Sequence, residues 1–288
     1  MTVARADRGQ DAATVEGFGR EWTAFDQSGV DEADLRRVFV SYFAVFPWDR
    51  LAPDAHGIDI GCGSGRWAQF VAPRVGRLTC VDASEDAVGV AGRTLAGHAN
   101  VEIRLGSAGA LPFPDGTFDF GYSLGVLHHT PDPEAALHDC VRVLRPGAPF
   151  LVYVYYALDG RPGWYRALWR ASDRLRRAVS RFPFGPRFWT SQVVAALVYW
   201  PLARGARLLA LLDVPRRFVD ALPLTYYRDK PLYMMRNDAL DRFGTRVEHR
   251  FTRAEMHAML ERVGVGHIEF SNDPPYWVAV GLIGRPSE

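Results

Sequence analysis

A glycine-rich segment between two apolar stretches constrains the fold of this chain more than any other feature of its sequence. Residues 58–65 read Ile-Asp-Ile-Gly-Cys-Gly-Ser-Gly, so an apolar strand runs directly into a turn. Glycine permits the tight turn and lets a ligand approach the backbone closely. Asp82 stands 21 positions after Gly61, at the end of the apolar stretch 78–81, where a carboxylate can bind a ribose diol. Together these features predict a nucleoside-containing cofactor.

Composition and charge narrow the class of protein. The chain has 288 residues, of which 48% are hydrophobic and 23% charged, as in a soluble globular protein with one large domain or one domain with an insertion. The formal net charge of +1 gives no overall attraction to nucleic acid or to an anionic membrane. We therefore expect no nucleic-acid partner and no membrane contact.

The cysteines and the apolar runs indicate the cellular compartment in which the protein is expected to act. Cys62, Cys80 and Cys140 fall in predicted core elements and have neither metal-ligand nor disulfide spacing. Residues 1–10 contain no signal-peptide stretch, and the longest apolar run, 193–200, is far shorter than the ~20 residues that span a bilayer. The sequence thus predicts a cytoplasmic protein without a metal site.

Strands and helices alternate between residues 56 and 156. Apolar strands are predicted at 56–60, 77–82, 101–105, 118–124 and 149–155. Helices are predicted between them at 66–72, 84–95 and 133–143, with Ser84 as the N-cap of the second helix. This alternation favours a mostly parallel sheet whose two faces are covered by helices.

Helical patterns flank this core. Residues 1–16 are small, polar and aperiodic and are predicted to be disordered. The aromatic residues that follow have helical spacing, and a second helix is predicted at 35–46. Near the other end, Thr252 and Glu255 predict a capping box and a helix over 252–263. Two last strands are predicted at 266–271 and 276–283.

The alternation stops between residues 157 and 245, which we interpret as an insertion. One amphipathic helix is predicted from Trp164, Leu168, Trp169, Leu175 and Val179. A second helix at 190–213, interrupted near Pro201, best fits a buried or dimer-contact element, with contact to a membrane or lipid-like substrate as the alternative. The arginines between 170 and 181 fit a solvated helix face, with phosphate contacts as the alternative. Residues 222–235 are aromatic and irregular.

A resemblance to one family separates the possible cofactors, since the glycine pattern alone also fits NAD or FAD. Segments 106–119, 124–130 and 141–147 follow the glycine turn in a characteristic order and spacing. The chain resembles the class I S-adenosylmethionine-dependent methyltransferases, in particular the UbiE-like small-molecule branch. The resemblance implies an α/β fold: a Rossmann-like, seven-stranded, mostly parallel sheet with its last strand antiparallel and helices on both faces.

The resemblance also implies a division of the chain into four segments. Residues 1–55 form an N-terminal tail and helical lid, and residues 56–156 form the core that binds S-adenosylmethionine. The insertion at 157–245, after strand five, is a substrate cap, and residues 246–288 complete the core sheet.

Cofactor contacts are carried over from the family position by position. The first motif wraps the methionine and ribose, Asp82 holds the ribose hydroxyls, the loop near 107 borders the adenine, and an aromatic lid covers the ligand. The residues implied are Phe18, Trp22, Asp59, Gly61, Cys62, Gly63, Gly65, Asp82, Ala83, Ser84, Ser107, Ala108, Gly109, Leu124 and Gly125. Many relatives carry an acid where Ser107 stands, which puts a direct contact to the adenine amino group in doubt.

Candidates for catalysis and substrate binding follow strand four and the insertion. His129 lies beyond a carboxyl strand end, where open α/β sheets bind ligands, and is the candidate general base. The substrate-binding candidates are rich in aromatic and hydrogen-bonding groups: His128, Tyr155, Tyr156, Tyr226, Tyr227, Arg228, Glu248 and His249.

The sequence predicts methyl transfer from S-adenosylmethionine to a small metabolite of specialised or cofactor metabolism, with S-adenosylhomocysteine as the second product. Oxygen, nitrogen and carbon acceptors all stay open, and so does a homodimer. One alternative is an enzyme that transfers or cyclises the aminocarboxypropyl arm of the same cofactor. Others are a non-catalytic cofactor-binding module, a nucleic-acid methyltransferase and a nicotinamide-dependent enzyme.

Overall fold

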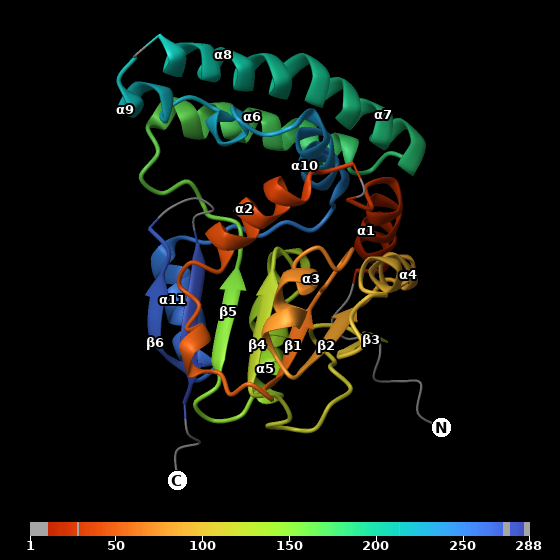
Figure 1. Ribbon diagram of the computed structural model, residues 1–288. Helices are drawn as coiled ribbons and strands as arrows, with labels where there is room; N and C mark the ends of the chain where they lie inside the picture. The colour runs from red at the N-terminus through yellow and green to blue at the C-terminus, as the bar shows by residue number, and fades with distance from the viewer. Residues whose placement is uncertain (1–10, 28, 213, 273–276, 285–288) are drawn as a thin grey trace. The chain divides into compact units, whose positions relative to one another are not determined.

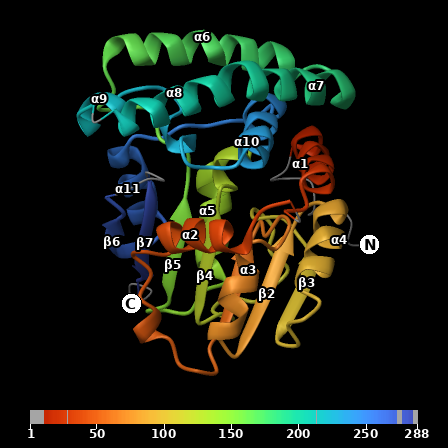
Figure 2. The same ribbon diagram turned by 45° about the horizontal axis from the view of Figure 1, so that its top comes forward.

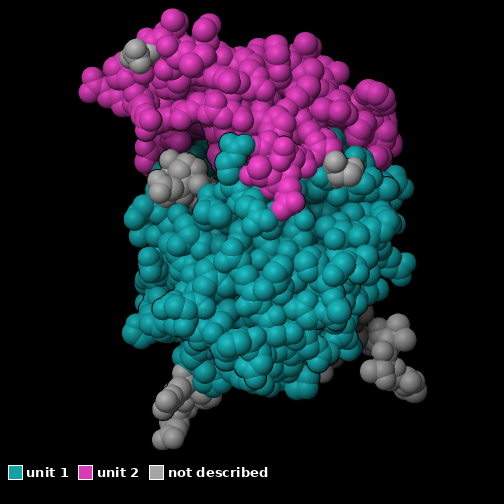
Figure 3. Space-filling model, viewed as in Figure 1, with its two compact units in different colours: residues 1–27, 35–159, 247–288 teal, residues 28–34, 160–246 magenta. Residues whose placement is uncertain are grey.

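A computed structural model describes residues 11–27, 29–212, 214–272 and 277–284 of the chain. Contacts between residues divide the protein into two compact units (Figure 3). The first is built from the chain up to residue 27, from 35–159 and from residue 247 onward. The second is built from 28–34 and 160–246, a range that overlaps the insertion expected at 157–245.

The first unit contains a seven-stranded sheet (Figure 1). Its strands are β1 His56–Ile60, β2 Arg77–Asp82, β3 Val101–Leu105, β4 Phe120–Leu124, β5 Pro149–Tyr153, β6 Val265–Phe270 and β7 Val278–Ile283. They lie in the order β3-β2-β1-β4-β5-β7-β6. β1 to β5 pair in parallel, and β7 pairs antiparallel with both β5 and β6. The predicted mostly parallel sheet with an antiparallel last strand is therefore confirmed.

Helices cover both faces of this sheet. The helices of this unit are α1 Ala12–Ala24, which packs on α4, and α2 Glu32–Tyr42, α3 Ala68–Val71, α4 Glu85–Thr94, α5 Pro133–Arg142 and α11 Arg253–Arg262. Single turns form η1 Trp48–Arg50, η2 Ala72–Arg74 and η3 Leu127–His129. Ile58 and Ile60 point into a core shared with α5 and α11. On the opposite face, Phe43 packs edge-on against Tyr122 with ring centroids 5.2 Å apart. Tyr122 is in register with Asp59 of β1, so Asp59 faces this second core while Ile58 and Ile60 on either side of it face the first, as β geometry requires.

Local signals predicted two helix starts well. Ser84 caps α4 by accepting from the amide of Ala87. Thr252 and Glu255 form the predicted capping box at the start of α11. Both devices depend on residues three positions apart, so the sequence is enough to predict them.

Three expectations about the first unit were wrong in part. The predicted disorder of residues 1–16 fails from Asp11 onward, because the Asp11 carboxylate accepts from the amide of Thr14 and caps α1. The helix expected at 66–72 is shorter than predicted: only α3 is α-helical, and a 3₁₀ turn that contains Pro73 follows it. Strands four and five are shorter than expected, each by two residues at one end. Tyr276, expected to open the last strand, lies outside the described residues.

The second unit is helical. It contains α6 Gly163–Val179, α7 Phe184–Val194, the π-helical turn η4 Ala195–Tyr199, α8 Trp200–Leu211, α9 Arg216–Val219, η5 Thr225–Tyr227 and α10 Leu232–Gly244. α7, η4 and α8 form one continuous helix, and Figure 2 shows it and α6 as the two long helices of this unit. α10 packs against both α6 and α7.

The structure refines the sequence interpretation of this unit at two places. The interruption expected near Pro201 is a π-helical turn that directly precedes α8. Proline has no amide hydrogen to donate, and a wider turn accommodates the missing bond without ending the helix. The irregular structure expected over 222–235 is wrong at its end, because α10 begins at Leu232. No side chain caps that helix start, so the usual sequence signal is missing.

Candidate functional site

The glycine turn after β1 is fixed by backbone hydrogen bonds to β2. The amides of Gly61 and Cys62 donate to the carbonyl of Val81 at 2.7 and 3.0 Å. Gly61 has a φ of 77°, and a Cβ atom there would collide with the Val126 side chain. Glycine is therefore required at this position both by the backbone conformation and by the space available.

Asp82 links this turn to the end of β2. Its Oδ2 atom accepts from the amide of Gly63 and its Oδ1 atom from the amide of Ser84, both at 2.9 Å. Burial raises the pKa of the Asp82 carboxyl, and these two amides oppose the rise. Each carboxylate oxygen has a second lone pair, so the group can still accept from a ligand diol.

The loop after β3 lies beside Asp82. The amide of Gly106 donates to the Asp82 carbonyl at 2.8 Å, and the following residues Ser107 and Ala108 are buried. The Ser107 hydroxyl accepts from the amide of Gly109. The structure therefore brings together the glycine turn, the acid and the loop for which the sequence predicts contacts to one nucleoside.

A buried carboxyl supports the base of the turn. Asp59 pairs in register with Tyr122 of β4, and both side chains are buried. Burial, with the charge of Asp82 nearby, raises the pKa of Asp59 to about 8. The Oδ2 atom of Asp59 has no hydrogen-bond partner within the described part of the chain. A buried acceptor of this kind is suited to a cationic or hydrogen-bond-donating ligand.

Helix α1 lies against the glycine turn. A Cβ atom on Gly63 would come within 2.7 Å of the Trp22 indole, so this ring lies directly on the glycine backbone. The Arg66 guanidinium lies 4.9 Å from the centroid of the same indole. Phe18, one turn earlier on α1, lies 5.0 Å from the His129 ring. Both aromatic residues of the predicted lid are thus placed beside other predicted site residues.

Two histidines follow β4 in the turn η3. His128 is fully buried, and its ring lies 3.9 Å from the Tyr155 ring and 4.0 Å from the His129 ring, measured between centroids. Burial lowers the pKa of His128 well below its usual range, so the imidazole is neutral. Neither of its ring nitrogens has a hydrogen-bond partner among the residues that the structure describes. An imidazole in this state is suited to a ligand or an ordered water.

His129 has a defined tautomer. Its Nδ1 atom lies 2.8 Å from the carbonyl oxygen of Val247. A carbonyl can only accept, so Nδ1 carries a proton in this contact. This tautomer allows Nε2 to take a proton from an incoming group, as a general base must. Sequence separation hides this contact, since the two residues lie 118 positions apart.

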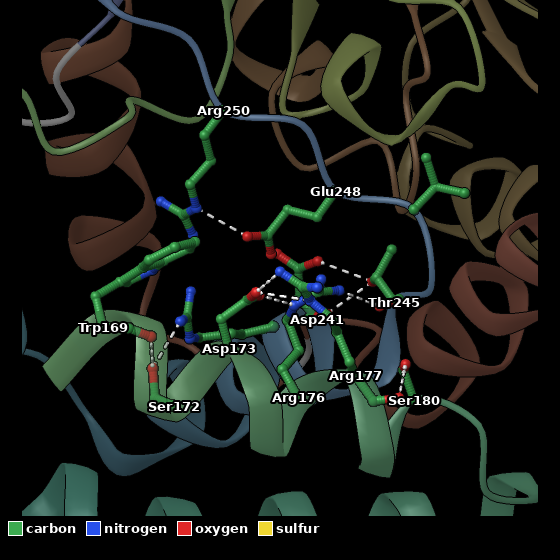
Figure 4. Close-up of polar contacts among 12 residues, drawn as sticks. Trp169, Ser172, Asp173, Arg176, Arg177, Ser180, Asp241, Thr245, Glu248 and Arg250 are labelled. Atoms are coloured by element: carbon green, nitrogen blue, oxygen red, sulfur yellow. Dashed lines mark hydrogen bonds and ion pairs between the residues drawn. The ribbon is translucent and has the colours of Figure 1, made fainter. Parts of the chain in front are cut away.

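Residues 247–251 run alongside these histidines and Tyr155. The amide of His249 donates to the His128 carbonyl at 2.8 Å. Arg250 pairs with the buried carboxylate of Glu248 at 2.8 Å and lies 5.0 Å from the Tyr155 ring centroid (Figure 4). The Arg250 guanidinium also donates to the carbonyl of Tyr156. The predicted residues Tyr155, Tyr156, Glu248 and His249 therefore lie together, and Arg250 joins them.

The remaining substrate candidates belong to the second unit and make contacts there. The Tyr227 hydroxyl donates to Asp238 at 2.8 Å, and the Arg228 guanidinium pairs with Asp220 at 2.9 Å. Tyr226 lies beneath the Lys230 ammonium, 4.1 Å from the ring centroid. These contacts give each side chain a structural role, and their role in substrate binding stays a prediction.

Neither thiol nor metal chemistry is indicated by the described residues. Cys62, Cys80 and Cys140 are buried. The neighbouring Cys80 and burial raise the pKa of the Cys62 thiol, so it is a poor nucleophile. Within residues 11–27, 29–212, 214–272 and 277–284, no group of three or more His, Cys, Asp or Glu side chains could hold a metal ion.

Known proteins resemble the part of the chain that holds this site. Residues 58–152 match the family model described as a methyltransferase domain. The chain is 34% identical over 119 residues to a Mycolicibacterium smegmatis protein described as a probable S-adenosylmethionine-dependent methyltransferase, covering 40% of this chain and 45% of the relative. It is also 34% identical over 122 residues to the demethylmenaquinone methyltransferase of Listeria monocytogenes, covering 40% and 50%. The chain thus spans half or less of the length of these curated relatives.

A solved structure resembles the chain over most of its length. It is the methyltransferase of Haloferax volcanii in complex with the Trm112 methyltransferase activator. The TM-score is 0.50 at 14% sequence identity, covering 93% of this chain and 98% of that chain. At this identity the likeness concerns the fold alone.

Proposed function

Because this chain carries a class I S-adenosylmethionine-dependent methyltransferase domain, we propose that it transfers the methyl group of that cofactor to a small-molecule acceptor. The observation that carries the proposal is the arrangement of Asp82, which holds the glycine turn and still has lone pairs for a ribose. The second product of the reaction is S-adenosylhomocysteine. A place in specialised or cofactor metabolism stays part of this proposal.

The residues present fit S-adenosylmethionine. Glycine at 61 and 63 lets the turn adopt positive φ angles and pack closely against Val126 and Trp22, so its backbone stands uncovered by Cβ atoms of its own. Asp82 would hold the ribose, Ser107 to Gly109 would border the adenine, and Leu124 with Gly125 would lie under the methionine part. The buried Oδ2 atom of Asp59 is an acceptor for a cationic group. When bound, the cofactor supplies an electrophilic methyl group on a sulfonium.

The protein's own contribution is to align the acceptor and remove its proton. His129 presents Nε2 as the base, and the Val247 carbonyl holds the ring in that tautomer. His128 and Tyr155 pack beside it and exclude water from the ring. The Glu248–Arg250 pair lies against Tyr155 and can orient a polar acceptor.

Replacing His129 with glutamine is expected to lower kcat by about 10²- to 10⁴-fold, the usual contribution of a general base. Cofactor affinity is expected to change by less than about threefold, because the base contacts the acceptor. The measurement is methyl transfer and cofactor affinity in the same preparation. His257→Gln, an exposed histidine of α11, is the matched control and should leave both unchanged. A His129→Gln variant with full turnover would remove the base from the mechanism.

The first test of the whole proposal is an incubation with methyl-labelled S-adenosylmethionine and fractions of a source-cell extract. Demethylmenaquinone belongs in the first panel of pure acceptors, since the Listeria relative is named for it. Label in a small molecule supports the proposal. A parallel incubation with carboxyl-labelled cofactor detects transfer of the aminocarboxypropyl arm. Cofactor binding without label in any product would instead indicate a non-catalytic module.

A further inference from the structure

Charge is distributed very unevenly along this chain. Residues 160–246 contain 17 Lys and Arg against 6 Asp and Glu, a formal net charge of +11. The rest of the chain contains 17 and 27, a formal net charge of −10. The overall value of +1 therefore conceals a strongly cationic helical segment. The expectation of no membrane contact takes its electrostatic argument from the overall value, which does not describe this segment.

The inner face of α6 is polar. Asp173 and Arg176 are both about 95% buried and form an ion pair at 2.7 Å (Figure 4). The Arg176 guanidinium also donates to the carbonyl of Thr245 at 2.9 Å. Ser180, directly after the helix, is buried as well. A helix in a water-soluble core normally turns its apolar stripe inward, whereas the residues that α6 buries are Asp173, Arg176 and only one apolar residue, Val179.

The outer face of α6 is apolar along one stripe and cationic along the next. Trp164, Leu168 and Leu175 are 50–53% exposed and lie on one side at helical spacing. Four exposed arginines succeed one another at spacings of three or four and form a second exposed stripe, which Ala167, Ala171 and Ala178 separate from the apolar one: Arg166, Arg170, Arg174 and Arg177. This pairing of aromatic and aliphatic residues with a flank of arginine is typical of helices that lie in a membrane interface.

The α7–α8 helix also leaves large apolar side chains exposed, although its buried side includes Ala195, Tyr199 and Ala203 of the unit's hydrophobic cluster. Arg187, Ser191 and Gln192 are buried, whereas Trp189, Leu197 and Leu211 are 68–72% exposed. Over Phe184–Leu211 this helix is long and apolar enough to cross a membrane, and only 22% of its most apolar 18-residue window is buried. Its inner side is held within the unit, since Arg187 and Arg204 donate to the carbonyls of Gly244 and Arg228. Because these contacts hold the inner side of the helix within its unit, they favour a helix that lies in the plane of a bilayer surface over one that crosses the bilayer.

We propose that the second unit binds the surface of an anionic phospholipid bilayer through the exposed stripes of α6 and α7–α8. Apolar side chains enter the acyl boundary while the arginines contact lipid phosphates. The charge of +11 selects an anionic lipid surface over a second copy of this chain, because two such faces would repel each other. Exposed apolar area of this kind marks an interaction site.

Sedimentation of the full chain with large unilamellar vesicles tests this. We expect strong binding to vesicles of phosphatidylglycerol and phosphatidylcholine and weak binding to phosphatidylcholine alone. The triple variant Arg166→Gln, Arg170→Gln, Arg174→Gln should lose about 100-fold in vesicle affinity. The triple variant Leu168→Gln, Leu175→Gln, Trp189→Gln should lose binding while keeping its charge.

A matched control removes three exposed arginines outside the segment: Arg37→Gln, Arg50→Gln and Arg93→Gln. It should bind vesicles within about threefold of the unmodified chain. Equal loss in this control would overturn the proposal, because charge in general would then explain the binding. Analytical ultracentrifugation of the same proteins measures whether they dimerise. If the unmodified chain is a dimer that does not bind vesicles, and the Leu168/Leu175/Trp189 variant is a monomer, then these stripes form a dimer interface and the proposal is contradicted. Binding to RNA but not to vesicles contradicts it equally.

Discussion

Replacing Asp82 with alanine is expected to lower the affinity for S-adenosylmethionine by about 100- to 1000-fold. The carboxylate would lose two charge-assisted hydrogen bonds to the ribose, each contributing about 1.5–3 kcal/mol. The substitution also removes the acceptor for the amide of Gly63, so the glycine turn loses its tie to β2. Isothermal titration with S-adenosylhomocysteine measures the change without turnover.

The matched control is Glu85→Ala, an exposed carboxylate in the first turn of α4. It removes the same charge three residues away and should leave the affinity within about threefold. Asp82→Asn should fall between the two, because an amide keeps one acceptor oxygen. An Asp82→Ala variant with nearly full affinity would contradict the ribose role. Far-UV circular dichroism of each variant shows whether the fold is retained.

Replacing Asp59 with asparagine is expected to stabilise the cofactor-free protein at neutral pH by about 2 kcal/mol. Burial raises the pKa of this carboxyl from 3.8 to about 8. Between these values the folded state keeps a proton that the unfolded state has released, so stability falls as pH rises from about 4 to about 8. At pH 7 the deficit is about 4 kcal/mol, and the buried amide of asparagine offsets part of the gain.

The dependence on pH identifies the cause. The free energy of unfolding of the Asp59→Asn variant should match the unmodified protein at pH 5 and exceed it by about 2–3 kcal/mol at pH 8. Urea unfolding at both pH values measures it, with the exposed Asp49→Asn as a control that changes neither. A difference independent of pH would indicate packing instead of ionisation. The same variant should bind the cationic cofactor more weakly, so the substitution increases stability and decreases cofactor affinity.

Features that depend on near neighbours could be predicted from the sequence. The cap at Ser84 and the capping box at Thr252 each involve residues three positions apart. The mostly parallel sheet with its antiparallel last strand could be predicted from the alternation of strands and helices together with the family resemblance. By contrast, the contact of His129 with Val247 joins distant segments, and nothing local in the sequence signals it.

The helices of the second unit show a different limit. The apolar residues between 164 and 179 predict an amphipathic helix, and α6 is a helix with apolar residues at helical spacing. Periodicity assigns residues to faces, but it does not say which face meets the protein. Trp164 and Leu168 are exposed, while the polar pair Asp173 and Arg176 is buried. The decisive signal was the local charge, which an average over the whole chain removes.

The position of Trp22 has a consequence for the thermodynamics of ligand exchange. Its indole rests on Gly63, the same backbone that a ligand in the glycine turn would approach. A ligand that needs this space must displace the indole, which acts as a competitor tethered within the same molecule. The effective concentration of that competitor depends on how firmly α1 packs in place. The observed dissociation constant is then the intrinsic constant divided by the fraction of molecules with the indole displaced. A weaker contact between Gly19 of α1 and Ser84 before α4 would raise that fraction and tighten apparent binding.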